Sequence, residues 1–206
     1  MELSLSDLDA IPYVDEAGRQ VLGPKWERAE QLDAVHFLQP HHRILEVGGC
    51  YGVTSCVINH LLADPSKHLV IEPREKMIQV MHKNRESHKA RFHTFHGAIS
   101  RTPLKIVDAS CFSCSEVESN VKTKSVEELE AQYDIDFNAL VIDCEGCILH
   151  LFRENSALLS KLEIILMEED RGDICNYKEV YEILDTFNFL RVKQGFHSVW
   201  KKQKHE

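Results

Sequence analysis

Apolar residues along the chain fall into two kinds of block that follow one another in turn. Short strand-like runs rich in apolar residues occupy 43–47, 68–71, 137–142 and 162–167, and a run that mixes apolar and polar residues occupies 91–95. Segments with helical spacing of apolar residues occupy 26–38, 53–62, 74–84, 126–132, 147–155, 156–160 and 177–187. This alternation predicts an α/β fold, a doubly wound sheet that is mainly parallel.

The last two apolar runs, 189–192 and 198–201, are too close together for a crossover helix. They must pair antiparallel, which predicts a C-terminal hairpin. No internal repeat or low-complexity linker interrupts the pattern, so we expect 1–206 to be a single domain, with 1–40 as a helical or irregular lead-in. The stretch 101–125 is the least regular, with a candidate strand at 104–107 followed by a loop or a hairpin.

Composition and charge narrow the choice of partners. Hydrophobic residues make up 43% of the chain and the formal net charge is −9. An acidic chain without a basic stretch, apart from the short tail 201–204, is not expected to bind nucleic acid. No apolar run approaches the about 20 residues that a membrane span needs. The acidic start 1–7 does not resemble a signal peptide.

The seven cysteines are expected to be reduced thiols, because no export signal precedes them, and this predicts a cytoplasmic protein. Two C-x-x-C pairs nevertheless stand out, Cys111 with Cys114 and Cys144 with Cys147. Together they have the spacing of a structural zinc site, which leaves a zinc-stabilised interaction domain as an alternative function. The favoured interpretation is that these cysteines are small buried hydrophobic residues.

In a doubly wound fold, ligands bind outside the carboxyl ends of the strands. The predicted ends carry acids or glycines: Glu46 with the glycine loop 48–52, then Glu72, the turn at 97–98, the segment 143–146, and the acids 168–170. A dinucleotide fingerprint would place its three glycines at Gly48, Cys50 and Val53, and two of the three are missing. The loop would suit a smaller group such as an amino-acid moiety, and an acid at 72 could accept both hydroxyls of a ribose. This combination favours S-adenosylmethionine over a nicotinamide dinucleotide.

At these residues the chain resembles a known family. Glu46-Val47-Gly48-Gly49-Cys50-Tyr51-Gly52 and Ile71-Glu72-Pro73 look like the first two motifs of class I S-adenosylmethionine-dependent methyltransferases. Leu140-Val141-Ile142-Asp143-Cys144-Glu145-Gly146 and Ile164-Ile165-Leu166-Met167-Glu168 are similar to motifs of the FkbM-type branch of that family. The resemblance covers roughly 30–200 and implies a Rossmann-like fold.

The resemblance also implies which residues hold the cofactor. The glycine loop would shape the methionine end of the pocket, Glu72 would hold the ribose, and 97–99 would lie against the adenine. The expected cofactor-binding residues are Glu46, Gly48, Gly49, Cys50, Tyr51, Gly52, Glu72, Pro73, Gly97, Ala98, Ile99 and Asp143.

The implied activity is O-methylation of a sugar, a glycan or another small hydroxylated metabolite, and the chain could be one domain of a larger glycan-processing enzyme. Two positions depart from the family pattern, Val141 where a Lys is common and Ile148 where a Glu is common. These departures leave a non-catalytic cofactor-binding module as a second alternative.

Transfer to a hydroxyl needs a general base or a metal. The candidate bases are Asp143, Glu145 and His197. The metal alternative is Mg²⁺ held by Asp143, Glu169 and Asp170, which supply hard oxygen ligands. The sequence leaves base and metal as open alternatives.

Overall fold

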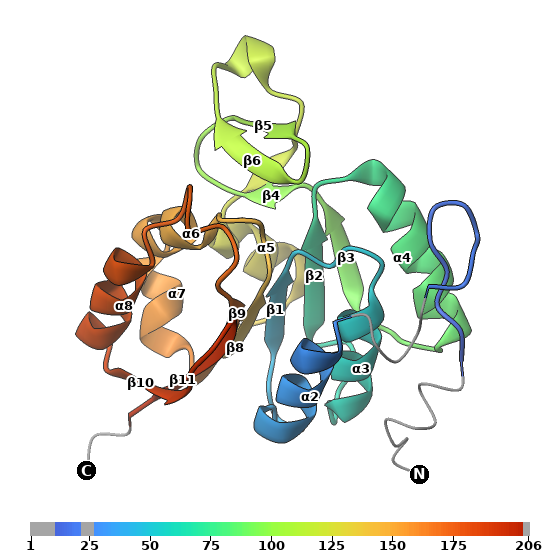
Figure 1. The fold of residues 1–206 in the computed structure, drawn as a ribbon, viewed down its shortest axis with the longest axis horizontal. Helices are drawn as coiled ribbons and strands as arrows, with labels where there is room; N and C mark the ends of the chain where they lie inside the picture. The colour runs from blue at the N-terminus through green and yellow to red at the C-terminus, as the bar shows by residue number, and fades with distance from the viewer. Residues whose placement is uncertain (1–10, 22–26, 204–206) are drawn as a thin grey trace.

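The computed structural model describes residues 11–21 and 27–203. Its centre is a seven-stranded sheet in the order β10-β11-β9-β8-β1-β2-β3 (Figure 1). The strands of this sheet are β1 (Ile44–Val47), β2 (His68–Glu72), β3 (His93–His96), β8 (Ala139–Ile142), β9 (Ile164–Glu168), β10 (Phe189–Lys193) and β11 (His197–Lys202).

The strand directions confirm the predicted fold class. Strands β3, β2, β1, β8 and β9 are parallel, with Val47 level with Ile71 on one side and with Ile142 on the other. Strand β11 runs antiparallel to both β9 and β10, so the last two strands form the expected hairpin. The fold is a Rossmann-like doubly wound sheet, mainly parallel, with an antiparallel C-terminal hairpin.

Helices cover both faces of the sheet. One face packs against α2 (Arg28–Phe37), α3 (Val53–Leu61) and α4 (Glu75–Ser87). The other packs against α5 (Val126–Tyr133), α6 (Ile148–Glu154), α7 (Ser156–Lys161) and α8 (Tyr177–Thr186). Because side chains alternate along a strand, Leu45 and Val47 belong to the second core and Ile44 to the first. This alternation decides which acids at the strand ends can reach a common site.

Helix α2 exists as predicted but buries a different side. The sequence places Leu32 and Val35 on its apolar face, yet they are 50% and 41% exposed. Ala34 is buried together with two polar residues, Gln31 and Asp33. Both polar residues are tolerated because they have hydrogen-bond partners: Arg28 of the same helix donates to Gln31, and Lys193 donates to Asp33 at 2.5 and 2.7 Å.

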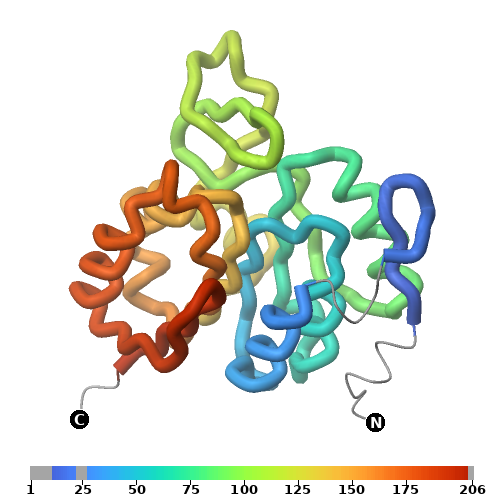
Figure 2. Tube along the Cα trace, viewed as in Figure 1, coloured from blue at the N-terminus to red at the C-terminus, as the bar shows by residue number. Residues whose placement is uncertain are grey.

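The irregular stretch after β3 forms a small separate unit. It contains β4 (Ala98–Ile99) paired with β7 (Thr123–Lys124), the hairpin of β5 (Leu104–Val107) and β6 (Ser110–Ser113), and a short 3₁₀ helix, Glu116–Glu118. We call 100–122 the insertion. It stands above the carboxyl edge of the sheet, and the Cα trace shows it projecting from the rest of the chain (Figures 1 and 2). In the described part of the chain, none of the helices has the length and apolarity to cross a membrane.

Candidate active site

The order of the sheet reverses at β1, which lies between β2 and β8, so the carboxyl ends of β1 and β8 open into a crevice. Gly48 follows β1 with φ +93°, and an ideal Cβ built on it would lie 1.6 Å from the carbonyl oxygen of Asp143. Asp143 also donates its backbone N–H to the carbonyl oxygen of Val47 at 2.9 Å. Only glycine permits this close approach of two strand ends.

A cleft of about 1050 Å³, open to solvent, lies at this edge of the sheet. It brings together many of the residues expected from the sequence: Gly48, Glu72, Pro73, Gly97, Ala98, Ile99, Asp143 and Glu145. It also includes residues that the sequence did not single out, among them Arg74, Leu104, Phe112, His150 and Ile174, together with Cys111 of the first C-x-x-C pair. The insertion supplies Leu104, Cys111 and Phe112, so the unit above the sheet edge forms one wall of the cleft.

Five of the expected cofactor residues are not part of the cleft lining: Glu46, Gly49, Cys50, Tyr51 and Gly52. The Cβ positions of Gly49 and Gly52 would lie 2.5 and 2.8 Å from Met81 of α4, which shows that this part of the loop packs against that helix. The hydroxyl of Tyr51 donates to Glu16 at 2.6 Å. The loop therefore supports the crevice more than it lines it.

Glu46 points to the opposite face of the sheet. It is 3% exposed, accepts a hydrogen bond from the hydroxyl of Ser55 at 2.6 Å, and lies 2.7 Å from Nε2 of His68. Its neighbour Val47 packs on the cleft side, so strand alternation directs Glu46 toward α3. The structure gives Glu46 a buried structural pairing.

Glu72 lines the cleft, but its carboxylate is fully engaged. One oxygen accepts hydrogen bonds from the backbone N–H and Nε of Arg74 at 2.9 and 2.8 Å. The other accepts from the backbone N–H of Cys50 at 2.9 Å and from Nη2 of Arg74 at 3.3 Å. Glu72 is only 1% exposed, so a ribose could reach it only if the Arg74 side chain moved aside.

Beside the cleft, three carboxyl groups crowd together, those of Asp143, Glu168 and Asp170, with candidate ligand oxygens within 4.8 Å of one another. The sequence expected Glu169 in this group, and that expectation is wrong. Strand β9 extends through Glu168, so alternation turns Glu169 away, where it accepts hydrogen bonds from Tyr181 and from Arg191.

Burial raises the pKa of two carboxyls in this cluster, those of Asp143 and Glu168. Burial and the hydrogen bond to Asp143 raise the pKa of Glu168 to about 9, and burial also raises the pKa of Asp143. The hydrogen bond between them raises the pKa of Glu168 but lowers that of Asp143, so Glu168 carries the shared proton and Asp143 accepts it. Asp143 thus faces the cleft as the acceptor of a hydrogen bond from a neutral Glu168.

Glu145 also lines the cleft, in a left-handed conformation with φ +53°. Burial and a hydrogen bond to Asp170 raise the pKa of its carboxyl. Its backbone carbonyl accepts a hydrogen bond from the hydroxyl of Ser110 at 3.0 Å, and Arg171 lies 3.9 Å from its carboxylate. Glu145 therefore connects the 143–147 loop to the insertion.

His197 is not part of this cleft. It lines a second, small cavity with Glu30, Asp33 and Glu168, and Asp143 lies between the two cavities. Nδ1 of His197 is 3.5 Å from Glu30, and burial lowers the pKa of the imidazole. Burial, with Asp143 and other nearby carboxylates, raises the pKa of Glu30 to about 10. Sequence reasoning missed Glu30, because it lies on a helix whose polar face is turned inward.

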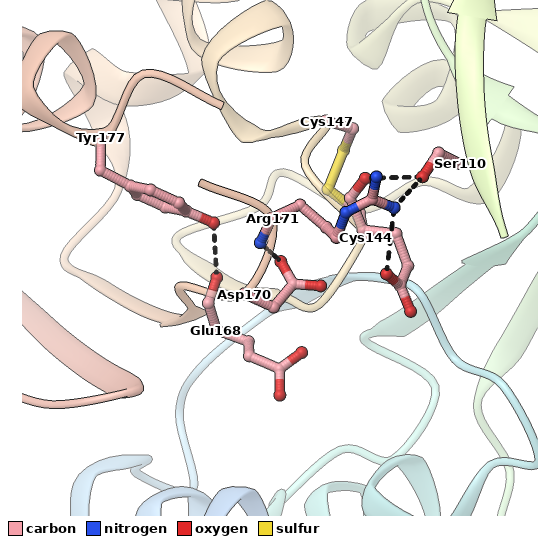
Figure 3. The surroundings of a disulfide bond; sticks show 8 residues. Ser110, Cys144, Cys147, Glu168, Asp170, Arg171 and Tyr177 are labelled. Atoms are coloured by element: carbon pink, nitrogen blue, oxygen red, sulfur yellow. Dashed lines mark hydrogen bonds and ion pairs between the residues drawn. A yellow bond between two sulfur atoms is a disulfide. The ribbon is translucent and has the colours of Figure 1, made fainter. Parts of the chain in front are cut away.

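The cysteine expectations need correction. Cys144 and Cys147 form a disulfide, so they are not reduced thiols (Figure 3). Both cysteines of each C-x-x-C pair are partly exposed, so they are not buried hydrophobic residues. Among the described residues, none of the groups with metal-binding geometry contains a cysteine. The structure therefore contradicts the zinc-stabilised alternative.

Solved structures share this fold. Precorrin-6y C5,15-methyltransferase from Geobacter metallireducens is 12% identical with a TM-score of 0.53, over 88% of this chain and 91% of that one. An rRNA methylase from Streptococcus thermophilus is 11% identical with a TM-score of 0.54, over 89% of this chain and 99% of that one. A putative tRNA (m1A22) methyltransferase from Streptococcus pneumoniae, in complex with S-adenosyl-L-methionine, is 15% identical with a TM-score of 0.53, over 87% and 75%.

No protein-family model and no curated protein matches this sequence. At identities between 11% and 15%, the likeness to the solved structures establishes the fold. The activity has to be argued from the residues of the cleft.

Proposed function

We propose that this protein is an S-adenosylmethionine-dependent methyltransferase that acts on a hydroxyl oxygen of a sugar, a glycan or another small hydroxylated metabolite. The observation that carries the proposal is the close approach of Gly48 to Asp143 at the switch point of the sheet, with Glu72 at the end of the next strand. Solved methyltransferases with the same fold, one of them bound to S-adenosylmethionine, support the choice of cofactor. The motif Asp143-Cys144-Glu145-Gly146 after β8 favours the FkbM-type branch.

The cleft residues fit this cofactor. A side chain at Gly48 would collide with the carbonyl of Asp143, so this glycine lets the two strand ends that border the cleft stay in contact. Ala98 and Ile99 offer an apolar wall for an adenine, and Glu72 is the acid nearest to where a ribose would lie. Arg74 would have to give up its hydrogen bonds to Glu72, and we expect the ribose hydroxyls to replace them.

The cofactor supplies an electrophilic methyl group on a sulfonium, and its transfer forms an O–C bond and breaks the C–S bond. The protein must align the acceptor and remove its proton. Asp143 is the candidate base because it lines the cleft and accepts a hydrogen bond from the neutral Glu168. Its raised pKa brings the carboxylate closer to the range of an effective base.

A hydroxylated acceptor suits the composition of the cleft. A carboxylate can act as the base that a hydroxyl acceptor needs when no metal assists, and the apolar side chains of Leu104 and Phe112 on the insertion can pack on the apolar faces of a sugar. The net charge of −9 argues against a nucleic-acid acceptor. Asp143, Glu168 and Asp170 could instead hold Mg²⁺, which would then take the place of the shared proton.

Binding of the cofactor is the decisive test. Isothermal titration calorimetry with S-adenosylmethionine should show a stoichiometric complex, and no heat of binding at millimolar cofactor would refute the proposal. Glu72→Gln should weaken binding by about tenfold or more, because a charged acceptor is lost. Glu75→Gln changes an exposed acid of α4 and serves as the matched control.

The acceptor can then be sought by transfer of a labelled methyl group to panels of sugars, polyols and RNA, with and without EDTA. Incorporation into a sugar or polyol that survives EDTA supports the base mechanism. Loss of incorporation in the presence of EDTA would instead support the mechanism in which a metal assists the hydroxyl. Incorporation into RNA alone would overturn the proposed acceptor class.

A further inference from the structure

The wall of the cleft contains the disulfide between Cys144 and Cys147, in the loop that joins β8 to α6 (Figure 3). We propose that this pair is a redox-active site that exchanges with external dithiols, and that its state sets the affinity of the cleft for its cofactor. The second half of this proposal rests on the proposed function, whereas the exchange itself does not.

The disulfide is accessible from the cleft. Cys144 and Cys147 are both partly exposed and both line the open cavity. Cys56 and Cys175, by contrast, are buried. A small dithiol can therefore reach the bond without unfolding the protein, because attack on a disulfide depends on access to one of its sulfurs.

The bond closes a loop with an unfavourable backbone. The two residues between the cysteines, Glu145 and Gly146, have φ values of +53° and +92°. A left-handed conformation is disfavoured for a residue with a side chain, so Glu145 needs surroundings that hold it there. A Cβ on Gly146 would lie 2.5 Å from the side chain of Ile174, so the loop is also packed tightly against the segment after β9.

Besides the disulfide, polar contacts with the insertion and with Arg171 hold this loop. The hydroxyl of Ser110 donates to the carbonyl of Glu145 at 3.0 Å, and Arg171 donates to that hydroxyl at 3.1 Å (Figure 3). Arg171 lies 3.9 Å from the Glu145 carboxylate. The disulfide is the covalent clamp on this part of the wall, and opening it releases the two left-handed residues.

The other cysteines near the cleft are poor internal partners for exchange. Cys111 lines the same cleft, but burial raises the pKa of its thiol to about 11, and burial raises that of Cys50 to about 12. Thiols with such pKa values are protonated at neutral pH, and only the thiolate attacks a disulfide. A dithiol from outside the chain is therefore favoured over Cys111 and Cys50 as the partner for exchange.

An external dithiol can reduce the bond in two exchange steps that account for every bond, proton and electron. A thiolate of the dithiol attacks one sulfur of the pair, forms a mixed disulfide and releases the other cysteine as a thiolate, which takes up a proton. The second thiol of the reductant then displaces the first cysteine. The dithiol is oxidised to a disulfide by two electrons, and Cys144 and Cys147 become thiols.

Reduction should weaken cofactor binding. Asp143 to Cys147 all line the cleft, and two separate thiols need more room than a bonded pair. Without the clamp, the loop must be ordered again when the cofactor binds, and lost preorganisation lowers affinity. We expect a decrease of about tenfold.

The test compares one protein sample in two redox states. The full chain is equilibrated with oxidised or reduced dithiothreitol, alkylated under native conditions and analysed by mass spectrometry, while calorimetry measures the affinity for S-adenosylmethionine. We expect Cys144 and Cys147 to resist alkylation in the oxidised protein and to be alkylated in the reduced protein. We expect the affinity for S-adenosylmethionine to fall about tenfold on reduction. The Cys144→Ser/Cys147→Ser variant should have the affinity of the reduced protein in both states. Cys114→Ser, outside the cleft lining, should respond like the wild type.

Two results would overturn the proposal. If the pair becomes alkylated only after denaturation, the disulfide is a fixed structural bond. If it exchanges but the affinity is equal in both states, the control of binding is refuted. A failure of the proposed function would look different, because the cofactor would bind in neither state while the alkylation pattern still decided the exchange.

Discussion

Gly48→Ala tests the close approach on which the cleft is built. The new Cβ would lie 1.6 Å from the carbonyl oxygen of Asp143, where ordinary contact begins at 3.4 Å, so the two strand ends would have to separate by most of the difference. Such a movement would break the 2.9 Å hydrogen bond from Asp143 to Val47. The φ of +93° would add strain of about 1–2 kcal/mol.

The expected loss of stability combines this strain with about 1 kcal/mol for the hydrogen bond and about 1–3 kcal/mol for overpacking. A total of about 3–6 kcal/mol would consume much of the stability of an ordinary domain. Urea unfolding measures it, and cofactor binding should be lost in whatever fraction remains folded.

Two other glycines provide controls for this variant. Gly18 has φ +72° and nothing lies within 4 Å of a Cβ at this position, so Gly18→Ala reports backbone strain alone. Gly172 does not have a left-handed φ and has nothing within 4 Å of a Cβ, so Gly172→Ala should leave stability nearly unchanged. If Gly48→Ala is no more destabilising than Gly18→Ala, the contact between β1 and β8 is not as tight as described, and the argument for the cleft fails.

Further variants separate the roles of the acids. The pKa of Glu168 is raised from 4.5 to about 9, so its contribution to stability is complete below pH 4.5 and is lost as the pH rises toward 9. Glu168→Gln should therefore flatten the fall in melting temperature between pH 5 and pH 8.5, and an unchanged slope would argue against the shared proton. With an acceptor available, Asp143→Asn should lower kcat by about 100-fold with little change in cofactor Kd, and a loss of less than tenfold would exclude Asp143 as the base. Glu46→Gln should cost about 1–3 kcal/mol of stability, because Ser55 and His68 lose a charged partner, and should leave cofactor affinity within about twofold. A large loss of cofactor affinity without loss of stability would show that Glu46 contributes to the cofactor site.

Most of the fold could be predicted because the central strands are buried on both faces and read as continuous apolar runs. This holds for β1, β2 and β8, whose observed bounds differ from the prediction by at most two residues. The small β4–β7 pair was missed because its strands are only two residues long and carry no pattern. Helix α2 was found by its spacing, but its buried side was not, because Asp33 is compensated by Lys193 from the far end of the chain.

The candidate site was predictable where position along a strand decides it. Glu72 and Asp143 come directly after or at the end of apolar runs, and both line the cleft. Glu169 was misplaced because the prediction ended β9 at 167 and treated the following acids as a loop, whereas β9 continues through Glu168 and its alternation places Glu168, not Glu169, beside Asp143. The disulfide could not be predicted, since the C-x-x-C spacing of Cys144 and Cys147 is equally compatible with a metal site, free thiols or a bond.

The pairing of β4 with β7 has a consequence for how this fold can diversify. Ala98 lies opposite Thr123 and Ile99 opposite Lys124, so the insertion leaves and re-enters the domain at neighbouring points. A segment anchored in this way can be lengthened, shortened or exchanged at little entropic cost and without shifting the register of the main sheet. Chimaeras that graft other insertions between these two strands should therefore change which acceptors are selected while the sheet and its glycine turn remain as they are.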